Sequence, residues 1–209
     1  MQREEIQTIC DTMSEGAYAF YYADGKQEPL LLSNRPAGER FLTASIIKVP
    51  ILYVWTLLEA QEVVSSDELC DFGDEPVVKG AGFSWLFRTR QLAYNDVLAM
   101  MIATSDNFCT NLIINRLGME RINQVFRDAF GFADTHLGRK MMNRPDPARG
   151  KDNWTTAGDV IRWFDLFERF SVDQQTFIGE KLAVCESANL FLRNIKGDAF
   201  DFYHKSGGL

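Results

Sequence analysis

The feature of this sequence that most constrains its fold is one long apolar stretch, residues 41–58. After Lys48 the residues are almost all apolar, and a helix that is apolar all round is buried in a protein core or in a membrane. A membrane span needs about 20 consecutive apolar residues, whereas this stretch is shorter and contains Lys48 and Pro50. The sequence therefore predicts a buried core helix that begins near Ser45 and carries a lysine in its first turn.

The remaining patterns place strands at the two ends of the chain and helices between them. Helical spacing and capping residues, including a capping-box pattern at Thr156 and Asp159, predict helices over residues 2–14, 94–101, 107–116, 119–130, 156–170, 173–183 and 186–194. Strands are expected over 17–22, 29–32 and 199–204, and loops over 64–85 and 139–153. This segregation favours a single α+β domain, residues 1–209, with an antiparallel sheet of N- and C-terminal strands packed on a helical region.

Composition and charge exclude several classes of function. The formal net charge of −7 argues against nucleic-acid binding, which needs a basic surface. The four cysteines and two histidines do not have the spacing of a metal site, so we expect buried free thiols, no metal and no cofactor. The polar N-terminus lacks the apolar core of a secretory signal, which predicts a cytoplasmic protein without a membrane anchor.

The first motif with chemical content is Ser45-Ile46-Ile47-Lys48. On a helix, residues i and i+3 share a face, so the Ser45 hydroxyl and the Lys48 amine can meet. Burial lowers the pKa of a lysine and favours its neutral, basic form. A neutral amine beside a serine is a nucleophile–base pair, although the same spacing also occurs by chance with an exposed lysine near a helix start.

Two further motifs combine hydroxyl, amide and cationic groups: Ser105-Asp106-Asn107 and Lys205-Ser206-Gly207-Gly208. The first is also a good helix N-cap, with Asp106 expected as a structural cap, so a purely structural interpretation competes with a functional one. The second follows a predicted strand. Its cation and hydroxyl suit a carboxylate, and its glycines let the backbone approach a substrate closely.

The three motifs occur in the order of class A β-lactamases and penicillin-binding proteins. The chain resembles the class A β-lactamases, a group of penicillin-recognising serine hydrolases, well beyond these motifs. The resemblance is carried by ASIIKVPIL, MIATSDNFCTNLIINRLG, FADTHLGRK, NWTTAGDV and LRNIKGDAFDFYHKSGG. Because these stretches cover nearly the whole chain, the resemblance implies the β-lactamase/transpeptidase-like fold.

The resemblance also implies a role for each motif residue. Ser45 would attack an acyl carbonyl, Lys48 would take its proton, and Ser105 would pass a proton to the leaving nitrogen, with Lys205 completing the catalytic set. The substrate-binding residues would be Asn107, Ser206, Gly207 and Gly208. Lys205 and Ser206 would receive a carboxylate, and the N–H groups of Ser45 and Gly208 would form an oxyanion hole.

The chain departs from the family pattern in the loop expected over residues 139–153. Alignment places Met141 where class A enzymes keep the glutamate that activates the deacylating water. The loop contains no glutamate, and Asp146 is either a substitute base or a solvated turn residue. Arg139 and Asp152 resemble the ion-pair clamp at the base of this loop. Losing a general base costs about 10²–10⁴-fold in rate, so we expect slow deacylation.

A second departure is that the chain stops soon after the third motif, so we expect the C-terminal strands and closing helix of the family to be missing. The sequence predicts acyl transfer through Ser45 on a small-molecule substrate, a β-lactam or a related amide or ester. The alternatives are a D,D-peptidase-like or esterase enzyme, and a non-catalytic penicillin-binding-like module. Phe83 and Trp85 are candidates for substrate contact, or else core residues.

Overall fold

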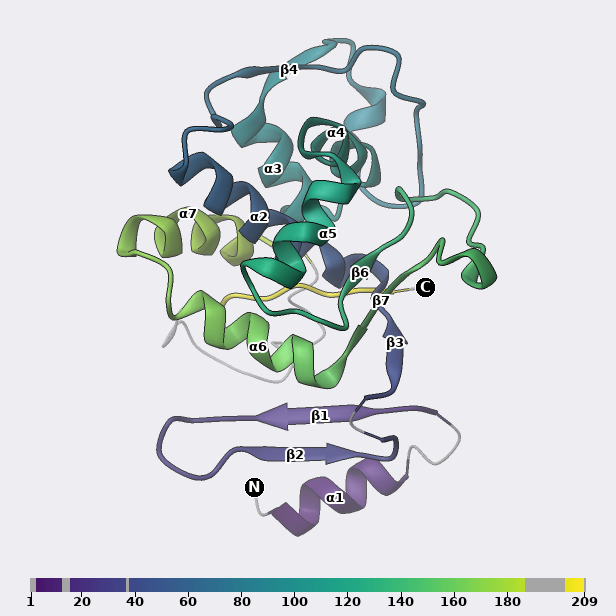
Figure 1. The fold of residues 1–209 in the computed structure, drawn as a ribbon, viewed down its shortest axis with the longest axis vertical. Helices are drawn as coiled ribbons and strands as arrows, with labels where there is room; N and C mark the ends of the chain where they lie inside the picture. Colours follow the sequence, from purple (N-terminus) through teal and green to yellow (C-terminus); the bar gives the residue numbers. More distant parts are fainter. Residues whose placement is uncertain (1–2, 13–15, 37, 187–201, 209) are drawn as a thin grey trace.

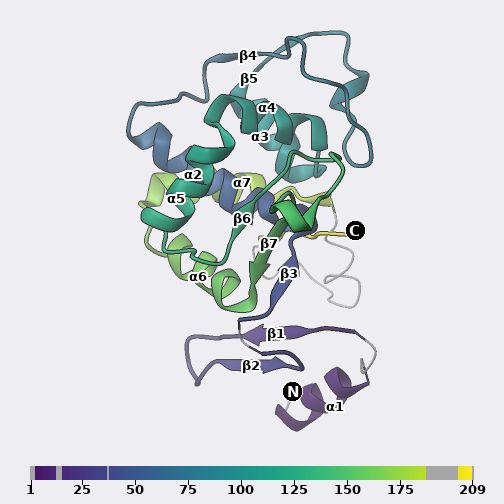
Figure 2. The same cartoon turned by 45° about the vertical axis from the view of Figure 1, so that its right-hand side comes forward.

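A computed structural model describes residues 3–12, 16–36, 38–186 and 202–208 of the chain. A helical body lies next to a thin layer formed by one hairpin and one helix, and both views show these two tiers (Figures 1 and 2). The layer consists of α1 (Arg3–Asp11), β1 (Ala19–Tyr22) and β2 (Leu30–Ser33). The body contains α2 (Lys48–Ala60), α3 (Tyr94–Ala103), α4 (Asn107–Leu117), α5 (Met119–Asp128), α6 (Ala157–Phe167) and α7 (Val172–Ala183).

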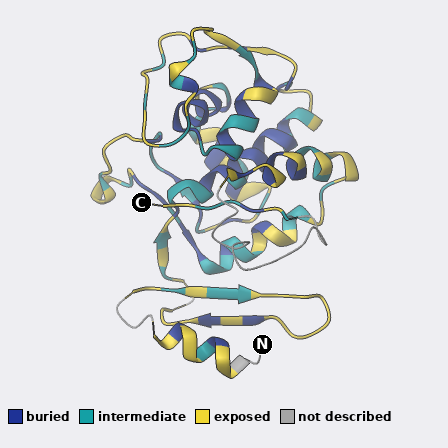
Figure 3. Cartoon of the chain, turned by 180° about the vertical axis from the view of Figure 1, so that it is seen from behind, coloured by how far each residue is buried: buried dark blue, intermediate teal, exposed yellow. Residues whose placement is uncertain are grey.

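The predicted core helix is α2, and it lies at the centre of the body. Ile51, Leu52, Val54 and Trp55 are completely buried, and α2 packs against α3, α5 and α7. Each fully buried aliphatic side chain contributes about 1.5–3 kcal/mol. Buried residues are concentrated in this body (Figure 3), while the hairpin layer has a smaller core of its own, formed by Ile6, Cys10, Leu30 and Leu32.

The strands of the described residues form three small antiparallel sheets, and one of them positions the start of α2. Its order is β3 (Arg40–Leu42), β7 (Asn153–Thr156), β6 (His136–Leu137). The other two sheets are β1–β2 and the pair of β4 (Leu69–Asp71) and β5 (Gln91–Ala93). Beyond β3, the N–H of Thr43 donates to the carbonyl of Asn153 at 3.0 Å. The chain then enters a 3₁₀ turn, Ala44–Ile47, which carries Ser45 into α2.

The α+β class is confirmed, and so are most of the predicted helices. The four cysteines are free and buried, as expected. Among the described residues, every helix is too short or too polar to span a bilayer. The strand expected over 199–204 is not present in its described residues, 202–204. A strand requires a hydrogen-bonded neighbour, which a local sequence pattern does not specify. Most of the helix expected over 186–194 lies outside the described residues.

The capping box predicted for α6 forms only in part. The Thr156 hydroxyl accepts a hydrogen bond from the N–H of Asp159, as expected. The Asp159 carboxylate, however, accepts from the N–H of Asp134 at 2.8 Å instead of returning to the cap. A complete capping box begins α7, between Ser171 and Gln174. The difference arises because a tertiary contact captured the carboxylate that the sequence pattern assigned to the cap.

The loop between β6 and β7 closes on itself around Gly138. Its N–H donates to the carbonyl of Asp152 at 3.0 Å. A Cβ atom built at this position would collide with the carbonyl oxygens of Gly150 and Asp152. Since these are backbone atoms, the loop itself would have to shift. The absence of a side chain at Gly138 therefore lets the two arms of the loop meet.

We predict that Gly138→Ala destabilises the protein by about 1–3 kcal/mol, the usual cost of overpacking. For a chain of this size that corresponds to a fall of roughly 2–12 °C in Tm, measured by circular dichroism. Gly158→Ala is the matched control, because its added Cβ would have no neighbour closer than 3.8 Å. Equal Tm values for the two variants would contradict the close packing at Gly138.

Candidate active site

The start of α2 brings the first predicted pair together. The Nζ of Lys48 lies 3.2 Å from the Oγ of Ser45. The residue before the serine, Ala44, has a φ of 44°, a conformation that costs a non-glycine residue about 1–2 kcal/mol. The 3₁₀ turn at Ser45 and the α-helical start at Lys48 thus place hydroxyl and amine side by side, as the i, i+3 spacing predicts.

Lys48 is completely buried and is surrounded by oxygen atoms. Besides Ser45, its Nζ contacts the carbonyl oxygen of Ser105 at 2.6 Å, the Oγ of Ser105 at 3.1 Å and the Oδ1 of Asn107 at 2.9 Å. The pKa of Lys48 is lowered from 10.5 to about 7, chiefly by burial and in second place by the charge of Lys205, while the charge of Asp106 acts in the opposite direction. The amine is therefore largely neutral above pH 7.

The second motif reaches Lys48 because of the turn between α3 and α4. Ser105 has a φ of 55°, which directs both its carbonyl and its hydroxyl toward the amine. Asp106 is the buried N-cap of α4: one carboxylate oxygen accepts from the N–H of Cys109 at 2.9 Å and the other from the N–H of Ser84 at 2.8 Å. Asp106 is therefore a structural cap, as expected, and it also fixes the loop before α3.

The third motif also reaches the start of α2. A Cβ added to Gly207 would lie 3.1 Å from the backbone nitrogen of Ser45 and 3.2 Å from the Cβ of Ala44, so the 202–208 segment packs tightly on the serine. The Lys205 amine donates to the carbonyl of Ser206 at 2.7 Å, and burial lowers the pKa of Lys205.

A cavity of about 360 Å³ opens beside Ser45 and is bounded by the loop that joins β6 to β7. Its lining comprises Leu42, Ala44, Ser45, Asn107, Arg139, Met141, Met142, Asn143, Arg144, Pro145, Asp152, Asn153 and Gly208. Three of the predicted site residues, Ser45, Asn107 and Gly208, thus line the same cavity. A larger cavity of about 770 Å³ lies between β1 and α6 and contains none of the predicted site residues.

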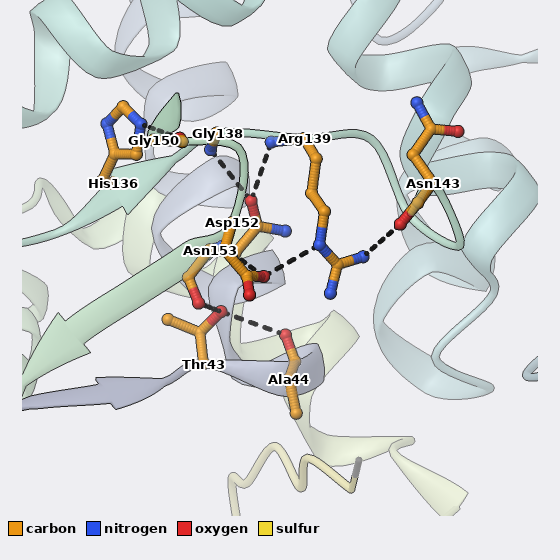
Figure 4. Close-up of polar contacts among 9 residues, drawn as sticks. All are labelled: Thr43, Ala44, His136, Gly138, Arg139, Asn143, Gly150, Asp152 and Asn153. Carbon is orange, nitrogen blue, oxygen red and sulfur yellow. Dashed lines mark hydrogen bonds and ion pairs between the residues drawn. The ribbon is translucent and has the colours of Figure 1, made fainter. Parts of the chain in front are cut away.

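The predicted clamp at the base of this loop is present (Figure 4). The Nε of Arg139 lies 2.8 Å from a carboxylate oxygen of Asp152, and its NH1 donates to the carbonyl of Asn143 at 3.1 Å. The side-chain oxygen of Asn153 accepts from the N–H groups of Gly138 and Arg139 at 2.9 and 3.1 Å. These contacts close the loop, and the bond from the Thr43 N–H to the Asn153 carbonyl ties it to the segment that leads into Ser45.

Met141 occupies the wall of the cavity and is buried. Its N–H donates to the Oδ1 of Asn111 at 2.8 Å, and the side-chain amide of Asn111 donates to its carbonyl at 3.3 Å. The backbone is thus held firmly, while the side chain is a thioether that cannot act as a base. Asp146 does not line the cavity, and its carboxylate lies 3.7 Å from the Nε of Arg149.

Sequence reasoning missed two asparagines, Asn111 and Asn153, that hold this loop, because a lone asparagine carries no recognisable pattern. Phe83 and Trp85 do not line the cavity beside Ser45. The indole of Trp85 donates to the carbonyl of Gly82 at 3.3 Å. Among the described residues, no group of three or more His, Cys, Asp or Glu side chains is placed to hold a metal ion.

Comparison with known proteins decides the family. The sequence model of the beta-lactamase enzyme family matches residues 2–209 of this chain. The chain belongs to the beta-lactamase enzyme family. A comparison with curated protein sequences finds no match.

Solved structures confirm the fold of this beta-lactamase family member. It is similar to a β-lactamase from Sphaerobacter thermophilus, with a TM-score of 0.83, 22% identity and coverage of 100% of this chain and 80% of that one. A class A β-lactamase from Mycobacterium abscessus has a TM-score of 0.81 and 19% identity, and the match covers 100% of this chain and 80% of that one. A PBP-A mutant, solved as an acyl-enzyme complex with penicillin G, has a TM-score of 0.79 and 24% identity, and the match covers 99% of this chain and 76% of that one.

We predict that Lys48 of this beta-lactamase family protein titrates near pH 7, far below an ordinary lysine. Protonated below that pH and neutral above it, its side chain can be followed by NMR with ¹³Cε-labelled lysine, assigned by loss of the signal in Lys48→Ala. In Lys205→Ala the pKa should rise, since the charge of Lys205 is one of its causes. A Lys48 signal that titrates above pH 10 in the parent protein would refute the buried neutral amine.

Proposed function

We propose that this chain is a class A β-lactamase-like serine enzyme that transfers acyl groups through Ser45 and hydrolyses the acyl-enzyme slowly. One observation carries the proposal: a completely buried lysine with a pKa of about 7 lies 3.2 Å from the Ser45 hydroxyl. A general base must lie within hydrogen-bond reach of the proton it removes and have a pKa near the working pH. Lys48 meets both requirements.

The oxygen atoms around Lys48 match a neutral amine. The backbone carbonyl of Ser105 and the Oδ1 of Asn107 can only accept, so they can take the two N–H groups of such an amine. The lone pair is then left for a hydroxyl proton, and the hydroxyls of Ser45 and Ser105 are the two available donors. This pattern supports a base that is ready to deprotonate Ser45.

Acylation then follows from these contacts. The proton of the Ser45 hydroxyl moves to the Lys48 amine, and the oxygen forms a bond to the acyl carbonyl carbon. The N–H groups of Ser45 and Gly208 would stabilise the resulting oxyanion. The carbonyl carbon–nitrogen bond breaks, and the leaving nitrogen receives the proton through Ser105, whose hydroxyl lies 3.1 Å from the amine. The proton thus passes from the Ser45 hydroxyl to the Lys48 amine and through the Ser105 hydroxyl to the leaving nitrogen.

Lys205 and Ser206 would orient the substrate through its carboxylate. Their segment packs directly on Ser45, since a Cβ atom at Gly207 would lie only 3.1 Å from the backbone nitrogen of the serine. A lysine and a hydroxyl form charge-assisted hydrogen bonds with a carboxylate. Asn107 would contact the side-chain amide of the substrate. Its own amide already donates to the carbonyl of Lys79 at 3.1 Å, which holds it in place.

Hydrolysis of the acyl-enzyme lacks a base in the expected position. The class A arrangement needs a carboxylate at the site of Met141, whose buried side chain offers none. The carboxylate of Asp146 faces Arg149 instead of the cavity. A general base contributes about 10²–10⁴-fold to rate. The PBP-A mutant solved as a penicillin G acyl-enzyme has a similar fold, and we extend that acyl-enzyme chemistry to Ser45.

The test is intact-mass spectrometry after incubation with penicillin G. We predict an adduct on Ser45 in the parent protein that persists for minutes or longer, and loss of labelling by at least about 10²-fold in Lys48→Ala. Lys181→Ala is the matched control, because it removes another buried lysine whose pKa burial lowers but which lies on α7. No adduct with any amide or ester donor would favour a non-catalytic binding module.

We predict that Met141→Glu speeds release of the penicillin adduct by up to about 10²–10⁴-fold, because it adds a carboxylate to the cavity wall. The rate is measured by following the adduct mass over time. Met142→Glu is the positional control: it adds the same charge to the same cavity lining one residue later, where the side chain lies against Gly80. Equal acceleration in both variants would show a general charge effect and contradict the assigned position.

A further inference from the structure

The cavity beside Ser45 carries an excess of positive charge within a protein of net charge −7. Its charged lining residues are Arg139, Arg144 and Asp152, two cations and one anion. The other lining residues are neutral. An acyl donor bound at Ser45 would extend its acyl side chain into this cavity, since the loop from β6 to β7 forms the wall beside the serine. The charges in that wall therefore act on the acyl side chain.

Arg139 does not supply the excess charge. Its guanidinium is 2.8 Å from the Asp152 carboxylate and also bonds to the carbonyl of Asn143 (Figure 4). Asp152 is 5% exposed and also accepts from the N–H of Asn153 at 2.9 Å. This pair is neutral as a unit and is committed to closing the loop. The excess positive charge of the cavity belongs to Arg144.

Arg144 has no partner in the described part of the chain. It is exposed, and it forms neither a hydrogen bond nor an ion pair with any described residue. The loop acid nearest to it in sequence, Asp146, faces Arg149 at 3.7 Å. A guanidinium offers five N–H donors in a planar fork that matches a carboxylate. Arg144 is thus a free anion-binding group in the lining of the cavity.

We infer that Arg144 binds an anionic group on the acyl side chain of the substrate, so that the enzyme prefers acyl donors that carry a second carboxylate there. The inference rests on the acyl transfer proposed above, and it concerns a different carboxylate from the one assigned to Lys205 and Ser206. Those two residues do not line the cavity. The preferred substrate is therefore a dianion, with one carboxylate for each end of the site.

Penicillin G and carbenicillin are a matched pair of probes, because carbenicillin differs by one carboxylate on the acyl side chain. Both acylate in the same way: the Ser45 oxygen bonds to the lactam carbonyl carbon, the ring C–N bond breaks, and the serine proton passes to the nitrogen. Rates of Ser45 labelling by both are measured by intact mass in the parent protein, Arg144→Gln, Arg144→Lys and Arg149→Gln. Arg149 is exposed, lies on the same loop and does not line the cavity.

We predict that the carbenicillin-to-penicillin G rate ratio falls about tenfold in Arg144→Gln, the size of one charge-assisted contact. The rate ratio should fall less in Arg144→Lys, and it should stay at the parent value in Arg149→Gln. The preference should also shrink at 1 M salt, because an exposed charge is screened. An unchanged ratio in Arg144→Gln, or an equal fall in Arg149→Gln, would overturn the assignment.

A second measurement separates this inference from acylation itself. Phenylmalonamic acid and phenylacetamide reproduce the two acyl side chains without a lactam ring, and their binding is followed by ligand-detected NMR. Tighter binding of the acid to the parent protein, lost in Arg144→Gln, supports the site even if neither penicillin labels Ser45, a result that would overturn only the proposed function. Equal binding of both fragments to the parent protein and to Arg144→Gln would overturn the role of Arg144.

Discussion

The structure of the site depends on one buried amine. Moving the pKa of Lys48 from 10.5 to about 7 corresponds to roughly 5 kcal/mol of preference for the neutral form. A buried polar group is tolerated only when it is hydrogen-bonded, and four oxygen atoms within 3.2 Å satisfy this one. Because those oxygens come from residues 45, 105 and 107, the amine holds the start of α2 and the start of α4 together.

The backbone around this amine is held in uncommon conformations. Four non-glycine residues in the described part of the chain have positive φ, and three of them lie at the site: Ala44, Ser105 and Met142. Each costs free energy and persists only where its surroundings over-determine it. Here the surroundings are the buried cap at Asp106, the packing of α2, and the closed loop between β6 and β7. These conformations bring the Ser45 hydroxyl, the Lys48 amine and the lining of the cavity close together.

Much of the fold follows from local patterns. The apolar run indicated α2 and its buried lysine, and Asp106 was expected as a cap. The clamp between Arg139 and Asp152 came from resemblance and is present. Other features depend on distant contacts. The carboxylate of Asp159 accepts from the N–H of Asp134 and does not complete the predicted capping box. Residues 202–204, which were expected to be part of a strand, are not in a strand. Local propensity cannot specify a partner that lies far away along the chain.

By itself the sequence predicted most of the helices of the described chain and the buried core helix among them, and it supplied the three motifs on which the proposed chemistry rests. These follow from periodicity and residue type, which are properties of neighbours along the chain. Only the tertiary structure decided that two carbonyl oxygens face the lysine, and that Arg139 is neutralised while Arg144 has no partner among the residues that the structure describes. These are contacts between groups on different segments or turns of one loop. They depend on how the packed core closes the chain, so no local pattern could have distinguished the two arginines.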